Sequence, residues 1–69
     1  MFINNPKLSA TQAADQFARD NWPEANRQVD HNTFRDAGRR GVYTFKLVQG
    51  VKTYRLEMMP HGYEIVDAE

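Results

Sequence analysis

Two neighbouring runs of alternating residues constrain the fold more than any other feature of this sequence. Residues 41–48 and 51–58 alternate with a period of two and are rich in β-branched and aromatic side chains. Only Gln49 and Gly50 separate the runs, a spacing typical of a β-hairpin closed by a two-residue type I′ turn. The sequence therefore predicts two antiparallel strands joined by a tight turn.

Such a turn also fixes which residues lie opposite each other across the hairpin. The register predicts three cross-strand pairs: Val48 with Val51, Phe45 with Tyr54 and Tyr43 with Leu56. One face of the hairpin is then apolar and aromatic, and consists of Tyr43, Phe45, Leu47, Tyr54, Leu56 and Met58. A continuous apolar layer of this kind needs another element to cover it.

A short amphipathic helix ahead of the hairpin is the expected cover. Ser9 and Gln12 have the spacing of a capping box, in which each side chain accepts from the backbone N–H of the other residue. Leu8 would pack on the first turn as a hydrophobic staple. Apolar residues then recur at spacings of three and four: Ala10, Ala13, Ala14, Phe17 and Ala18. Proline disfavours helical backbone angles in the residue before it, so the helix is expected to end before Pro23. Residues 23–27 are candidates for a further short helical turn.

The remaining segments extend the sheet. A turn at residues 59–62 precedes a third strand at 63–67, in which Tyr63 and Ile65 point to the core. Residues 28–35 alternate poorly, and residues 36–41 are expected to form a flexible connection. The predicted fold class is α+β, with one N-terminal helix on an antiparallel sheet of three strands, or four if residues near 29 to 35 form one.

A chain of 69 residues predicts a single domain, residues 1–69. It has no cysteine, which excludes disulfides and thiolate zinc sites, and its two histidines are too few to hold a structural metal. No cofactor is expected. No stretch is apolar enough for a membrane span or a secretory signal, so we expect a cytoplasmic protein that does not bind membranes.

Residues that often serve in catalysis have simpler interpretations here. Ser9, the only serine, is explained as a helix cap. His31 lies between Asp30 and Asn32 without a second histidine or a metal-ligand framework nearby, and His61 lies in a predicted turn. Two further carboxylates, Glu57 and Glu64, are expected on neighbouring strands, but a small sheet offers little concavity for a paired acid and base. We therefore expect a protein that is not an enzyme.

Charge is distributed unevenly although the formal net charge is zero. Residues 25–56 contain seven basic and two acidic side chains, whereas residues 57–69 contain four acidic side chains and no lysine or arginine. The seven basic residues are Arg27, Arg35, Arg39, Arg40, Lys46, Lys52 and Arg55. This asymmetry predicts one basic and one acidic surface. The alternative is that the two regions meet in the folded sheet and neutralise each other across strands.

The outer face of the hairpin is less polar than is usual for a solvent-facing sheet. It comprises Val42, Thr44, Lys46, Val48, Val51, Thr53, Arg55 and Glu57, joined by Val66 from the third strand. The valines are expected to form a small apolar patch suited to a partner protein or to a second copy of the chain. The alternative is that valine and threonine are present only because they favour strands.

The expected function is that of a small non-enzymatic binding protein that occupies a surface of a protein partner. Its size suits an inhibitor, for example a phage or mobile-element inhibitor of a host defence or transcription machine. The alternative is a nucleic-acid-binding protein that uses a basic loop, against which the zero net charge argues. The candidate binding residues are Arg35, Arg39, Arg40, Lys46, Arg55, Val48 and Val51.

Overall fold

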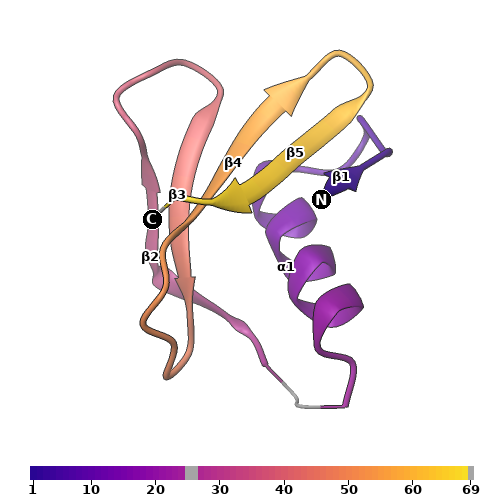
Figure 1. Ribbon diagram of the computed structural model, residues 1–69. Helices are drawn as coiled ribbons and strands as arrows, with labels where there is room; N and C mark the ends of the chain where they lie inside the picture. The colour runs from indigo at the N-terminus through magenta and orange to yellow at the C-terminus, as the bar shows by residue number, and fades with distance from the viewer. Residues whose placement is uncertain (25–26, 69) are drawn as a thin grey trace.

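The computed structural model describes residues 1–24 and 27–68, in which one helix packs against an antiparallel sheet (Figure 1). The elements in chain order are β1 (Phe2–Ile3), α1 (Ala10–Asn21), β2 (Val29–Asp36), β3 (Val42–Leu47), β4 (Tyr54–Met59) and β5 (Gly62–Asp67). The α+β class is confirmed. The expected number of strands was wrong, because the sheet has five strands rather than three or four.

The order of strands in the sheet is β1-β5-β4-β3-β2. The last four strands follow one another as a meander, and the N-terminal strand pairs with the C-terminal one. The helix therefore connects the two edges of the sheet and crosses one of its faces on the way (Figure 1). This connection leaves the opposite face without a helix.

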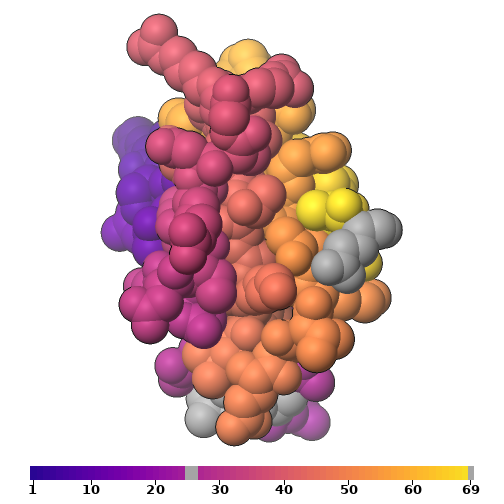
Figure 2. Space-filling view, turned by 90° about the vertical axis from the view of Figure 1, so that its left-hand side faces the viewer, coloured from indigo at the N-terminus to yellow at the C-terminus, as the bar shows by residue number. Residues whose placement is uncertain are grey.

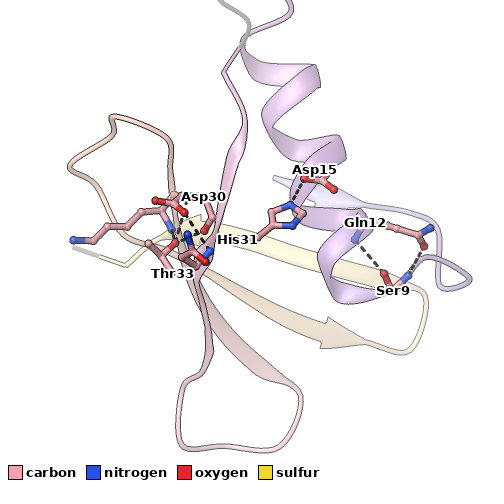
Figure 3. Close-up of polar contacts among 8 residues, drawn as sticks. Ser9, Gln12, Asp15, Asp30, His31 and Thr33 are labelled. Carbon is pink, nitrogen blue, oxygen red and sulfur yellow. Dashed lines mark hydrogen bonds and ion pairs between the residues drawn. The ribbon is translucent and has the colours of Figure 1, made fainter.

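The capping box that begins α1 is confirmed. The Gln12 backbone N–H donates to Ser9 Oγ at 3.1 Å, and the Ser9 N–H donates to Gln12 Oε1 at 2.8 Å (Figure 3). The helix buries its alanine stripe and Phe17, and it ends one residue before Trp22. Residues 25 and 26 of the further turn considered at 23–27 lie outside the described residues. No helix in the described part of the chain has the length and apolar character to cross a membrane.

Replacing Ser9 by alanine is expected to lower the free energy of unfolding by about 1 kcal/mol, because the first turn of α1 loses the side-chain acceptor of one backbone N–H. Urea denaturation followed by circular dichroism measures this change. Ser9→Asp, which keeps an acceptor at the cap, is the matched control and should stay close to the wild type. Equal stability of Ser9→Ala and the wild type would contradict a stabilising role for the cap.

Two of the three predicted cross-strand pairs of the β3–β4 hairpin are confirmed, whereas Val48 and Val51 lie outside the paired strands. Phe45 lies opposite Tyr54, and Tyr43 lies opposite Leu56. Met58 continues this face but remains 51% exposed.

The turn of this hairpin differs from the prediction. The strands stop at Leu47 and resume at Tyr54, so residues 48–53 form a loop. The Gly50 N–H donates to the Leu47 carbonyl at 2.9 Å, and the positive φ of 61° falls on Gln49 rather than on glycine. Val48 instead donates its backbone N–H to Gln28, which precedes β2, at 2.8 Å. The expected type I′ turn was wrong because the tight turn closes one residue earlier, between Leu47 and Gly50.

The core lies between α1 and the sheet. Its buried members are Ile3, Ala13, Ala14, Phe17, Ala18, Val29, Phe45, Leu47, Leu56, Tyr63 and Ile65. Phe45 is the centre of an aromatic cluster, with ring centroids 6.1 Å from Phe17, 5.7 Å from Tyr54 and 6.1 Å from Phe34. Since these rings come from α1, β2, β3 and β4, the cluster joins the helix to three strands.

Residues 29–36 form the additional strand that the sequence left open, but β2 contains a large bulge. Between the pairs Asp30–Lys46 and Arg35–Thr44, four residues of β2 face the single residue Phe45. The Thr33 hydroxyl accepts the Lys46 N–H at 2.7 Å and donates to the Asp30 carbonyl at 2.7 Å (Figure 3). The Thr33 side chain thus takes the place of a backbone carbonyl as the partner of the Lys46 N–H. The bulge interrupts the alternation of β2, which explains why the sequence shows only a weak strand pattern there.

Candidate binding surface

The face of the sheet that α1 does not cover is the most prominent free surface of the structure. We call it the open face; its side chains are Arg35, Val42, Thr44, Lys46, Arg55, Glu57, Glu64 and Val66, which alternate with the core residues along the strands. Figure 2 looks onto this face and shows β2, β3 and β4 side by side. Any partner that binds here meets side chains of strands rather than of the helix.

Three basic side chains gather on the open face. Arg35 of β2 and Arg55 of β4 both lie opposite Thr44 of β3, which places them in one row across three strands. Lys46 follows Thr44 by two positions and therefore points to the same side. All three side chains are exposed. We call Arg35, Lys46 and Arg55 the basic strip.

The bulge in β2 is what brings Arg35 to this face. Val29 points to the core, and in a regular strand every second residue after it, Arg35 included, would do the same. The register shift between Asp30 and Arg35 turns the later half of β2 over, so Phe34 packs on the core and Arg35 joins the open face.

The loop between β2 and β3 adds two more cations. Arg39 and Arg40 are exposed in this loop, between Gly38 with a φ of +83° and Gly41 with a φ of +79°. The Arg39 carbonyl accepts the Val42 N–H at 3.1 Å, which closes the loop beside the strands. The loop begins directly after β2, whose last residues include Arg35 (Figure 1).

Within residues 1–24 and 27–68, no acidic side chain forms an ion pair with the basic strip or with the two arginines of the loop. Ion pairs in that part of the chain join Met1 to Glu64 at 3.5 Å and Lys52 to Asp67 at 3.3 Å, and His31 lies 3.2 Å from Asp15. They include none of the five cations of the strip and loop. Asp30 is the cross-strand neighbour of Lys46, but its carboxylate accepts the Asn32 N–H at 3.1 Å.

Acidic residues lie on the same face, toward its other edge. Glu57 and Glu64 are direct cross-strand neighbours, as the sequence predicted. Like charges in this position repel each other, and the Met1 amino group, 3.5 Å from the Glu64 carboxylate, offsets the repulsion. These two glutamates, on β4 and β5, form the acidic side of the open face and lie in the row next to Arg35, Thr44 and Arg55.

The valines of the expected apolar patch are distributed differently from the prediction. Val48 and Val51 lie in the loop at 48–53, outside the paired strands, with exposed fractions of 49% and 84%. Val66 is half-buried on the open face, opposite Arg55. Val42, which was expected to face solvent, is buried to 3% exposure.

The residues considered for catalysis have structural contacts. His31 Nε2 lies 3.2 Å from Asp15 Oδ1 and links β2 to α1 (Figure 3). Ser9 caps the helix. Groups of three or more histidine, aspartate or glutamate side chains that could hold a metal ion are absent from the described part of the chain. Comparisons of the chain with protein-family models, with curated proteins and with solved structures found no match.

Proposed function

We propose that this chain is a non-enzymatic binding protein whose basic strip and β2–β3 loop dock on an acidic surface of a protein partner. The observation that carries the proposal is the set of five exposed cations on β2, β3, β4 and the β2–β3 loop, none of them in an ion pair with a described residue. Arginine suits this role because its planar guanidinium forms paired hydrogen bonds with carboxylates. An inhibitor or an adaptor acts through such a surface.

The acidic side of the open face favours a protein partner over a nucleic acid. Glu57 and Glu64 lie in the next row of the sheet and repel a long polyanion, whereas a protein can place its own cations opposite them. The position of the aromatic rings agrees with this argument. Of the eight aromatic residues only Phe2 is exposed, so the open face lacks the row of rings on which single-stranded nucleic acids stack.

A nucleic-acid-binding protein is the second candidate, and the β2–β3 loop is the observation that favours it. Arg39 and Arg40 are exposed between two glycines, and Arg35 lies close by on β2. Short basic loops of this kind contact phosphates.

Replacing both Arg39 and Arg40 by alanine is expected to slow association with the protein partner by about tenfold, because the loop attracts its acidic surface. Affinity capture from a lysate of the source organism identifies the partner, and the association rate is then measured with both purified proteins between about 50 and 300 mM salt. The variant should also show a weaker dependence on salt. Lys7→Ala/Lys52→Ala, which removes the same charge elsewhere, is the control and should associate at nearly the wild-type rate.

Duplex DNA and RNA, tested by fluorescence anisotropy at about 150 mM salt, distinguish the two candidates. Submicromolar binding that disappears in the Arg39→Ala/Arg40→Ala variant would favour the nucleic-acid function and contradict the first proposal. We expect no such binding.

A further inference from the structure

A cleft of about 640 Å³ lies between the C-terminal half of α1 and the start of β2, away from the open face. Its walls include the buried side chains of Ala18 and Val29, the indole of Trp22, and the polar side chains of Arg19 and Arg27. The volume falls within the range of small-molecule sites, which combine apolar walls with a few polar groups that fix the ligand.

Trp22 lines the cleft, and its ring packs on two other aromatic side chains. Its ring packs edge-on against Phe17 at 5.8 Å and against Tyr54 at 6.3 Å between centroids. Arg27 lies over the ring, with the guanidinium carbon 5.4 Å from the centroid. A rigid aromatic surface flanked by a cation favours a planar ligand with negative charge.

The charges that line the cleft point to the same ligand. Arg19 from α1 and Arg27 from the segment before β2 reach it from two different elements, and both are exposed. Neither is in an ion pair with a described residue. The acidic member of the lining, Asp15, is engaged by His31 at 3.2 Å. Arg19 and Arg27 thus bring to the cleft two guanidinium groups that no described carboxylate pairs with, and that of Arg27 lies over the Trp22 ring.

We propose that this cleft binds a small organic anion that carries an aromatic ring, such as an aryl carboxylate or an aryl phosphate. The ring lies against Trp22 and the apolar wall, and the acid group pairs with Arg19 and Arg27. This site is separate from the open face, so it does not depend on the function proposed above.

Trp22 is the only tryptophan of the chain, which makes its fluorescence a direct reporter of the cleft. The probes are phenyl phosphate and benzoate, with inorganic phosphate as the charge without a ring and benzyl alcohol as the ring without a charge. We expect phenyl phosphate and benzoate to change the Trp22 fluorescence saturably, with dissociation constants between about 0.1 and 10 mM. Inorganic phosphate and benzyl alcohol should bind at least about tenfold more weakly. Amide shifts in NMR spectra, expected at Ala18 and Val29, locate the bound probe.

Arg19→Gln tests the role of the charge without removing a buried group. It is expected to weaken the binding of phenyl phosphate by about tenfold or more. Lys7→Gln, which removes one exposed positive charge outside both the cleft and the open face, is the matched control and should bind as the wild type does. The absence of saturable binding by either aryl anion, or undiminished binding by Arg19→Gln, would overturn the proposal. Equal affinity for inorganic phosphate would also overturn it, because the ring would then contribute nothing.

Discussion

Phe45→Ala is expected to lower the free energy of unfolding by about 3–5 kcal/mol. Phe45 is only 1% exposed, and its ring packs against Phe17, Phe34 and Tyr54, so truncation leaves a cavity bordered by the helix and two neighbouring strands. These rings cannot all move inward, since each is held by its own element. The loss is comparable to the whole stability of a domain of this size, and we expect a largely unfolded variant.

Thermal unfolding followed by circular dichroism, together with urea titration at 25 °C, measures the effect. Val51→Ala is the control, because Val51 is 84% exposed and its truncation should change the stability by less than about 0.5 kcal/mol. Cooperative melting of Phe45→Ala near the wild-type temperature would show that this face of the sheet is not the core.

Gly62→Ala is expected to have the second largest effect, a loss of about 3 kcal/mol or more. The φ of Gly62 is +156°, and a Cβ at this position would lie 1.9 Å from the carbonyl oxygen of Ile3. This neighbour is backbone, which a change of side-chain rotamer cannot move. The variant can therefore form β5 only by pushing β1 away from the sheet.

Hydrogen exchange tests the displacement of β1 directly. The Ile65 N–H donates to the Met1 carbonyl at 2.8 Å, so its exchange in Gly62→Ala should accelerate more than that of core amides in β3 and β4. Gly38→Ala is the matched control: Gly38 has a φ of +83° but nothing within 4 Å of the added Cβ, so only backbone strain of about 1 kcal/mol is expected. Unchanged protection of Ile65 would mean that β1 tolerates the methyl group.

The features that the sequence predicted well depend on neighbouring residues. The capping box requires only Ser9 and Gln12, three positions apart, and the helix stripe repeats within a few turns. The pairs Phe45–Tyr54 and Tyr43–Leu56 were predicted correctly although the turn type was wrong, because the alternation of both strands favours this register independently of the loop.

Strand β1 escaped prediction for the opposite reason. It has two residues, Phe2 and Ile3, which are too few to show alternation, and it pairs with Tyr63 and Glu64 near the other end of the chain. One signal was present: Gly62 marks a place where another backbone approaches closely, but a glycine two positions after a proline also fits an ordinary turn.

The candidate surface was predictable in its residues but not in its arrangement. Charge counting identified the basic region, yet the row formed by Arg35, Thr44 and Arg55 depends on the bulge in β2. That bulge is held by contacts of Asp30, Asn32 and Thr33, polar residues whose spacing does not reveal a shift of register. The cleft was missed because Arg19 and Arg27 converge only once the helix lies on the sheet.

The same bulge has a consequence for self-association. The outer strands of a sheet expose unpaired N–H and C=O groups, and long regular outer strands can template the addition of further strands and lead to aggregation. Here one outer strand, β2, is irregular at its middle, and the other, β1, is two residues long. Neither offers a straight ladder to an incoming chain. The bulge that turns Arg35 outward thus also helps to keep the sheet from growing into fibrils.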